Sequence, residues 1–134
     1  MAYGTLSNIK VDPVAGYFSA KFTADATVAA CSVFCGFTPR IIKMSQIAGS
    51  LTTAAASFAF ESNTAGTNGV LTNLVHGTGA ATVTTANGFT FLTGTEAVPT
   101  SIAVNSPVTV GGPGFIIGTA VHGTTQVYLI EAVR

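Results

Sequence analysis

The residues best suited to chemistry in this chain are two cysteines and two histidines. Cys31 and Cys35 lie four residues apart in an apolar run typical of a β-strand. On a strand that spacing is about 13 Å, too far for a disulfide bridge between them. A zinc site would need two more ligands, and only His76 and His122 are available, each in a Val-His-Gly-Thr segment typical of a turn. We expect no metal site in one chain, although histidines from several subunits could share an ion. Buried thiols that form no disulfide are consistent with folding in a reducing cytoplasm.

The carboxylates show no recognisable acid–base pair. They are Asp12, Asp25, Glu61, Glu96 and Glu131. A glycosidase-type pair needs two carboxylates within about 10 Å, and the pattern assigns no two of them to one face. The chain also lacks G-x-S-x-G, a Cys–His arrangement with a third orienting group, and a phosphate-binding loop. We therefore expect no catalytic residue, no cofactor and no enzyme. A small β-fold hydrolase is an alternative that no group of residues supports.

The elements that carry these residues are predicted to be strands. Thr, Val and Ile supply 43 of 134 residues, whereas Glu, Lys, Gln and Arg are scarce. Gly, Pro and Asn interrupt the chain at the short intervals of a β-sandwich or barrel. The sequence thus predicts an all-β fold: a single β-sandwich or jelly-roll-like domain over residues 17–134. Residues 1–16 are predicted to form a short N-terminal arm or edge segment.

Individual strands follow from hydrophobic alternation and turn residues. Strands are expected over residues 17–23, 27–35, 40–47 and 126–133, with a break at 36–39 and a wide loop at 111–114. Residues 50–61 favour a loop or short helical turn followed by a strand, and 63–69 favour a loop. Asn87-Gly88 predicts a hairpin turn between two short strands. Residues 126–133 are apolar on both faces, which indicates a strand that is central in the sheet or buried in a subunit contact.

Charge is unusually sparse. Only 7% of residues are charged, the formal net charge is zero, and residues 62–95 and 97–130 carry no charge at all. No basic cluster points to nucleic acid, no apolar run is long enough to span a membrane, and the N-terminus does not resemble a secretory signal. Edge strands normally carry Lys, Glu or Pro against unwanted pairing. The second half mostly lacks such residues, so we expect its edges to be covered by copies of the chain or by another assembly.

Two segments resemble a known family. Residues 36–43 (GFTPRIIK) are similar to the G-F-x-P-R-x-[VI]-x segment found in many small virion proteins of tailed bacteriophages. Residues 114–121 (GFIIGTAV) and 127–134 (VYLIEAVR) resemble the C-terminal G-F-x-[IVL]-G segment and the last strand of the same proteins. The likeness covers about a third of the chain. The Glu-Trp pair frequent in those proteins is missing, with Phe60-Glu61 as its nearest counterpart.

The resemblance implies a non-enzymatic virion component of the capsid decoration, or cement, type. Such a protein would assemble in the bacterial host cytoplasm as a homo-oligomer, a trimer by preference. It would then bind the major capsid protein on the outer shell surface, without nucleic acid or membrane as a partner. The candidate contact residues are Lys10, Arg40, Lys43, Tyr128 and Ile130. A tail-fibre or host-recognition module of a virion is the alternative, disfavoured because the tyrosines do not cluster on loops.

Overall fold

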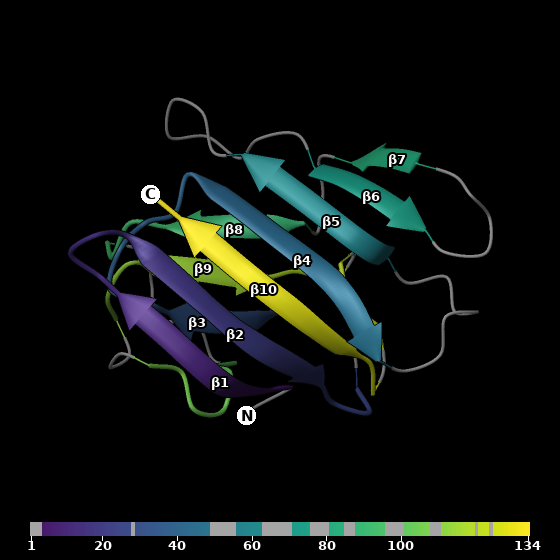
Figure 1. The fold of residues 1–134 in the computed structure, drawn as a ribbon, viewed down its shortest axis with the longest axis horizontal. Coiled ribbons are helices and arrows are strands. Elements are labelled where there is room, and N and C mark those ends of the chain that lie inside the picture. Colours follow the sequence, from purple (N-terminus) through teal and green to yellow (C-terminus); the bar gives the residue numbers. More distant parts are fainter. Residues whose placement is uncertain are drawn as a thin grey trace.

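The chain folds into two antiparallel sheets. The computed structural model describes residues 4–27, 29–48, 56–62, 71–75, 81–84, 88–95, 101–107, 111–119, 121–123 and 125–134, with 56–62, 71–75 and 81–84 described as backbone. Within these residues the fold is all-β and contains no helix, as the composition predicts. The strands are β1 Gly4–Asp12, β2 Tyr17–Ala24, β3 Cys31–Phe34, β4 Ile41–Ala48, β5 Ala56–Ser62, β6 Leu71–Val75, β7 Ala81–Thr84, β8 Phe89–Leu92, β9 Gly114–Ile117 and β10 Val127–Val133 (Figure 1).

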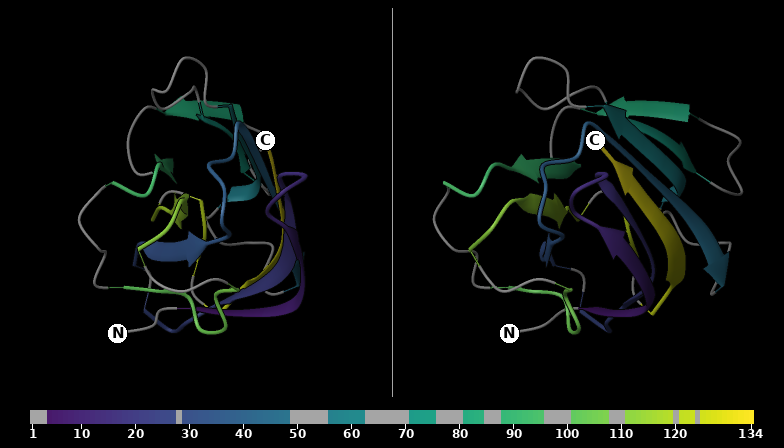
Figure 2. Two further views of the ribbon diagram at one scale, coloured as in Figure 1. Left: turned by 90° about the vertical axis from the view of Figure 1, so that its left-hand side faces the viewer. Right: turned by 60° about the vertical axis from the view of Figure 1, so that its left-hand side comes forward.

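The two sheets form the layers of a sandwich. The larger sheet has seven strands in the order β1-β2-β10-β4-β5-β6-β7, and the smaller has three in the order β3-β9-β8. The smaller sheet lies behind β1, β2, β10 and β4 in Figure 1, and Figure 2 shows the two layers from the side. Strands β5, β6 and β7, hereafter the wing, extend beyond the smaller sheet (Figures 1 and 2). The predicted β-sandwich-like domain is therefore confirmed.

The core lies between the smaller sheet and the first four strands of the larger one. Strand β2 alternates as expected, with Phe18, Ala20 and Phe22 buried. The Phe115 ring of β9 contacts Phe18 edge-on with centroids 5.7 Å apart, and contacts Phe89 of β8 at 6.5 Å. The Phe18–Phe115 contact joins the two layers, whereas Phe89 and Phe115 both belong to the smaller sheet.

Strand β10 is central in the larger sheet. It pairs along its whole length with β2 on one side and with β4 on the other. Of the two alternatives predicted for an apolar closing strand, the central position is the one observed. Only one face is buried, because Leu129 and Glu131 are exposed while their neighbours in sequence point into the core.

The N-terminal segment forms the edge strand of the larger sheet. Residues 4–12 are strand β1, which pairs with β2 from Gly4↔Ala24 to Asp12↔Tyr17. A register shift between Ser7 and Lys10 accommodates Asn8, whose φ of 51° lies in the left-handed region that Asn tolerates better than most residues. Of the arm and the edge segment considered for this part of the chain, residues 4–12 adopt the edge strand.

Strand β3 is shorter than the expected run over 27–35, but all four of its residues are buried. Its outer edge is covered by residues 101–103: the Ser32 N–H donates to the Ser101 carbonyl at 3.0 Å, and the Ala103 N–H donates to the Ser32 carbonyl at 2.9 Å. The strand predicted at the end of 50–61 is β5, whereas the loops predicted at 50–55 and 63–69 lie outside the described residues.

The hairpin predicted at Asn87-Gly88 is wrong. Strand β7 pairs with β6 in the larger sheet, whereas β8 pairs with β9 in the smaller one, so the chain crosses between layers here. The physical reason is the burial of β8: Phe89 and Phe91 enter the core opposite Ile117 and Phe115. Burying these rings in the second layer outweighs the local preference for a tight turn.

Candidate interaction surface

The candidate site is the outer face of β1, β2, β10 and β4, the face turned away from the smaller sheet. Register aligns Lys10 with Ser19, Ser19 with Glu131, and Glu131 with Lys43 in one row across the strands. Lys10, Glu131 and Lys43 are exposed. Opposite charges directly across strands contribute about 0.2–1 kcal/mol to pairing. The fold thus brings two predicted contact residues into one row of alternating charge.

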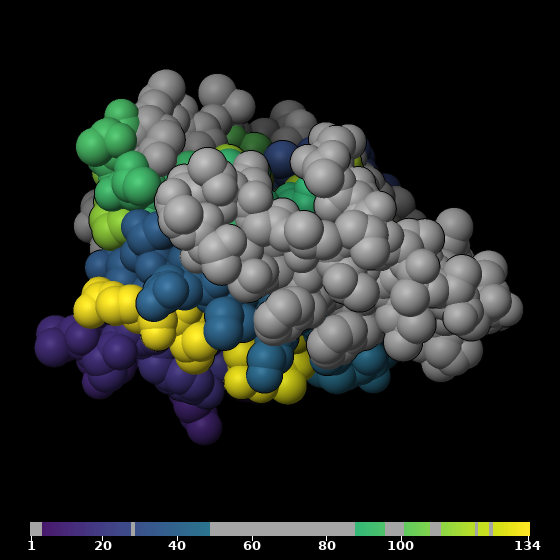
Figure 3. Space-filling model, turned by 90° about the horizontal axis from the view of Figure 1, so that it is seen from above, coloured from purple at the N-terminus to yellow at the C-terminus, as the bar shows by residue number. Residues whose placement is uncertain are grey.

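The neighbouring rows mix apolar and charged side chains. One row aligns Asp12, Tyr17 and Val133, and the row on the other side aligns Lys21 and Leu129. Tyr17 is 39% exposed and Leu129 is 42% exposed. Figure 3 shows the strands of this face as adjacent purple, yellow and blue bands. Amphipathic surfaces of this kind, with apolar contact area beside charge, are common in protein interfaces.

Arg40 lies outside these rows. It is exposed in the segment before β4, and its backbone N–H donates to the carbonyl oxygen of Val133 at 2.8 Å. The backbone contact positions the start of β4 against the end of β10. Arg40 therefore precedes β4 and takes no part in the row of Lys10, Glu131 and Lys43.

The wing continues the outer face with apolar residues. Register aligns Lys43 with Phe60 and then with Thr72 and Val83, and it aligns Ser45 with Phe58 and then with Leu74. Residues paired across a sheet lie on the same face. Phe58 and Phe60 therefore belong to the same face of the sheet as Ser45 and Lys43. Their alternation in the sequence did not reveal which face this is.

Tyr128 and Ile130 are not surface contact residues, which corrects the prediction from the sequence. Both are fully buried, on the face of β10 that meets the smaller sheet. The strand has apolar residues on both faces, so the sequence did not decide which set points inward. Register with Phe22 and Met44, both buried, settles it, and leaves Leu129 and Glu131 on the outer face.

The Tyr128 hydroxyl holds the loop before β10. It accepts a hydrogen bond from the Gly123 N–H at 2.8 Å and donates to Gln126 Oε1 at 3.1 Å, and the ring stacks on Phe22 with centroids 6.3 Å apart. Burial raises the pKa of Tyr128, and the bond from Gly123 opposes that shift in part. The hydroxyl is therefore a neutral structural group.

His122 belongs to the same buried cluster. Its Nδ1 lies 2.8 Å from the Gly118 carbonyl oxygen, so Nδ1 carries the proton and donates. The ring meets Phe22 edge-on at 5.6 Å, and Nε2 has no hydrogen-bond partner in the described part of the chain. Burial lowers the pKa of His122, against the opposing carbonyls of Gly118 and Ala29. His122 is therefore a buried side chain in the loop before β10 and not the turn residue that the sequence predicts, whereas His76 lies outside the described residues.

The two cysteines are buried thiols in the core. Cys35 Sγ donates to the Phe37 carbonyl at 3.2 Å. Burial raises the pKa of Cys35 to about 11, and the hydrogen bond with Phe37 opposes part of that rise. The group is therefore a thiol at neutral pH, and a thiol is a poor nucleophile and metal ligand. Among the described residues, no three His, Cys, Asp or Glu side chains are grouped to hold a metal ion.

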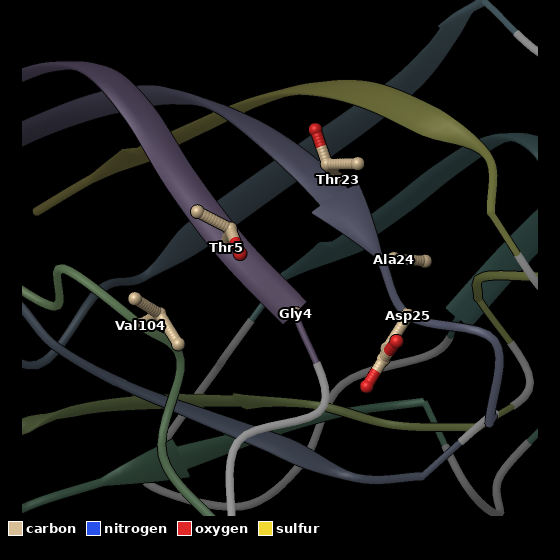
Figure 4. A pocket seen from close by; sticks show the side chains of 6 residues that line it. All are labelled: Gly4, Thr5, Thr23, Ala24, Asp25 and Val104. Carbon is tan, nitrogen blue, oxygen red and sulfur yellow. The ribbon is translucent and has the colours of Figure 1, made fainter.

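The two aspartates lie at opposite ends of β2 and act locally. Asp12 Oδ1 accepts from the Val14 and Ala15 N–H groups at 3.1 Å each, which closes the β1–β2 turn. Asp25 Oδ1 accepts from the Ala26 N–H at 2.7 Å. Asp25 also lines a shallow hollow of about 280 Å³ together with Gly4, Thr5, Thr23, Ala24 and Val104 (Figure 4). The hollow presents one carboxylate and two hydroxyl groups, which is not an acid–base pair.

The segments that resemble phage virion proteins meet in space and join the two sheets. Gly36, with φ of 86°, donates from its N–H to the Pro113 carbonyl at 3.1 Å, directly before β9. Thr38 Oγ1 donates to the Leu92 carbonyl at 2.7 Å. Gly114 leaves no space for a side chain, because an added Cβ would clash with the Val33 carbonyl oxygen. Gly36 and Thr38 lie in the segment that carries the chain from β3 to β4, and Gly114 begins β9, so the contacts described here are structural.

Arg134 is a contact residue that the sequence reasoning missed. Its guanidinium donates to the carbonyl oxygens of Pro13 at 2.9 Å and Val14 at 3.3 Å, and it lies 5.7 Å from the centre of the Phe37 ring. The C-terminal residue thus fastens the β1–β2 turn and the break after β3 together. Nothing in the sequence signals this contact, because it joins residues about 120 positions apart.

Comparison with protein-family models, with curated proteins and with solved structures found no match. Among the described residues there is no helix that could cross a membrane.

Proposed function

We propose that this protein is a structural component of a bacteriophage virion, a capsid decoration protein that binds the major capsid protein on the outer shell. One observation carries the proposal. Five of the ten charged residues gather on the outer face of the larger sheet, while residues 62–95 and 97–130 carry none. The five charged residues on this face are Lys10, Asp12, Lys21, Lys43 and Glu131. A docking face that carries half of the charged residues of a sparsely charged domain suits a subunit covered by an assembly.

The outer face would dock through its charged row. Lys10 and Lys43 flank Glu131, so a shell surface with the inverse order of charges would be recognised in one orientation. Tyr17 and Leu129 add apolar area beside the row. Strands β2 and β10 hold these side chains on a rigid sheet backed by the core, so that little conformational entropy is lost on binding. Homo-oligomerisation, with the trimer implied by the resemblance, would multiply this contact.

Binding of this protein would stabilise the capsid shell by mass action. A protein that binds the assembled shell and not its dissociated subunits stabilises the shell by an amount that grows with its concentration relative to Kd. No covalent step is required. Because the docking row is charged and exposed, binding would weaken as salt rises.

The test is binding of purified protein to expanded, empty shells of the phage that encodes it. The wild-type protein is expected to decorate the shells, and the double variant Lys10→Glu/Lys43→Glu is expected to bind at least about tenfold more weakly, which is about 1.4 kcal/mol. Thr90→Glu, at an exposed position on β8 in the smaller sheet, is the matched control and should bind like the wild type. A stable monomer without affinity for shells would contradict the proposal. Binding to host cells instead would favour the host-recognition alternative.

A further inference from the structure

The turn between β1 and β2 carries an apolar side chain out into solvent at one end of the hairpin. Val14 is 89% exposed, the highest value among the exposed large hydrophobic side chains of the described residues. It lies between Pro13 and Ala15, which are exposed as well. In Figure 1 this turn is at the left side of the larger sheet. A lone exposed valine is common on protein surfaces, but the turn that holds this one is also fixed in an unusual number of ways.

The polar backbone groups of this turn are hydrogen-bonded within the protein. The N–H groups of residues 14–16 all donate to Asp12, two of them to Oδ1 at 3.1 Å and one to the carbonyl oxygen at 2.8 Å. Arg134 donates to three carbonyl oxygens of residues 13–16, two through its guanidinium and one through its backbone N–H. Burying the turn against another molecule would leave these bonds intact, so its desolvation costs little. A rigid turn also loses little conformational entropy on binding.

The opposite end of the same hairpin carries the shallow hollow. Register places Gly4↔Ala24 at that end and Asp12↔Tyr17 beside the turn. The hollow has a volume of about 280 Å³, and an apolar cavity of about 150 Å³ already holds a benzene molecule, so a valine side chain fits. Val104, which is 43% exposed, supplies its largest apolar side chain (Figure 4). Hydrogen bonds of 2.9 Å from the Val104 N–H to Gly4 and from the Leu6 N–H to Val104 fix this wall.

We propose that the β1–β2 turn of one copy of this chain inserts Val14 into the hollow beside Val104 of a second copy. The two cannot meet within one chain, because the nine residues of β1 span about 30 Å between them. The second copy is the occupant because the chain itself presents both halves of the contact, a rigid apolar projection and a hollow that contains an exposed valine. Removing two exposed valines from water drives the contact.

Charge at the two ends is complementary. Asp25 contributes a carboxylate to the hollow, and its Oδ1 accepts from the Ala26 N–H at 2.7 Å. Arg134 places a guanidinium directly behind the turn, within 2.9 Å of the Pro13 carbonyl oxygen. An arginine has five N–H groups, so this one can also donate to a carboxylate across the contact. The Asp12 carboxylate, the other charge at the turn, already accepts from N–H groups of the turn itself. The pair of Arg134 and Asp25 would set the orientation of the second copy.

The contact is head to tail, because two different surfaces meet. Each copy offers one turn and one hollow, so copies add in the same sense until the assembly closes into a ring. The trimer named in the proposed function would contain three such contacts; that number rests on the proposed function, whereas the contact does not. The charged row of Lys10, Glu131 and Lys43 lies between the two ends of the hairpin, so it stays available for docking to a shell.

The experiment mixes two variants, each with one half of the contact changed, and measures mass by sedimentation or light scattering. The wild-type protein should form an oligomer of 13.5 kDa chains. Val14→Asp and Val104→Asp should each raise its dissociation constant by at least about tenfold, because a carboxylate replaces an apolar contact and lies close to Asp25. Mixed together, the two variants should form a one-to-one pair, because the intact turn of one fits the intact hollow of the other. Ile47→Asp is the matched control: it is 55% exposed on β4, two strands away from β2, and should leave the mass unchanged.

A cross-linking measurement tests the same contact without added charge. Val14→Cys mixed with Val104→Cys should give a disulfide-linked pair on mild oxidation, whereas neither variant alone should do so. Cys31 and Cys35 are buried and should not react.

Three outcomes would overturn the proposal. They are a wild-type protein that stays monomeric at all concentrations, failure of the mixed aspartate variants to pair, and cross-linking of one cysteine variant alone as strong as that of the mixture. The last outcome would indicate that the same surface of both copies meets. These measurements involve no shells, so a failure here is distinguishable from a failure of the virion proposal.

Discussion

The two ends of the seven-stranded sheet have different surroundings. At the β1 end, Leu6 of β1 and both phenylalanines of β2 are fully buried against the smaller sheet. The wing at the β7 end extends beyond that sheet, and register places Phe58 and Phe60 on the same face as the exposed Lys43. The first end therefore contributes to the buried core, whereas the second extends the larger sheet beyond the smaller one.

The largest expected effect compares a buried leucine with an exposed one. Leu6→Ala should lower the free energy of unfolding by about 2–5 kcal/mol, because it empties a fully buried position in the core. Leu129→Ala on the outer face of β10 should cost under about 1 kcal/mol, because Leu129 is 42% exposed. Chemical denaturation of both variants checks the pair. Equal losses would show that burial in the core does not set the cost.

The next largest effect is expected from the buried hydroxyl group of Tyr128, whose ring stacks on Phe22 of β2. Tyr128→Phe should lower the free energy of unfolding by about 1–3 kcal/mol, because the buried Gly123 N–H loses its acceptor. Tyr17→Phe, at an exposed position on the outer face, is the matched control and should change stability little. Thermal unfolding of the two variants gives the comparison. A loss as large in the control would show that the buried hydroxyl is not the cause.

Acid should lower the stability of the fold through protonation of His122. Burial holds the pKa of His122 below its ordinary value of 6.5, so the unfolded chain binds the proton more readily than the folded one. The free energy of unfolding should therefore fall as the pH drops below about 6.5, and this loss should be absent above it. His122→Gln should flatten the profile in that range. If the variant keeps the wild-type slope, His122 is not the group responsible.

The smallest expected effect is at the β1–β2 turn. Arg134→Ala removes hydrogen bonds to Pro13 and Val14 and a contact with the Phe37 ring, at an exposed position. It should lower stability by about 0.5–1 kcal/mol and raise amide exchange at the turn. Arg40→Ala serves as the matched control, since its backbone N–H bond to Val133 survives the substitution. Unchanged exchange at residues 13–16 would contradict the role assigned to Arg134.

Much of the fold was predictable from local patterns. The alternation in residues 17–23, the break at 36–39, and the strands over 40–47 and 126–133 all occur where the sequence places them. These features depend on periodicity and on residues such as Gly36, whose positive φ suits a break. The hairpin at Asn87-Gly88 failed because burial of Phe89 and Phe91 in the other layer outweighed turn preference.

The candidate surface was predictable only in part. Lys10, Arg40 and Lys43 are exposed, as a sparse charge pattern suggests, but their alignment with Glu131 depends on strand order. Tyr128 and Ile130 were placed on the wrong face of a strand that is apolar on both. Arg134 was missed because its partners are remote in sequence.

The sequence by itself determined that this chain is a β-protein with few charges and a second half without charged edges. Composition and periodicity are local properties, and they suffice for strand formation. The tertiary structure alone decided which strands pair, which face of β10 is buried, and how Val104 covers part of the β1 edge. Those outcomes depend on contacts between residues far apart in the chain, where burial of apolar area in two packed layers selects one register from several that the local pattern allows.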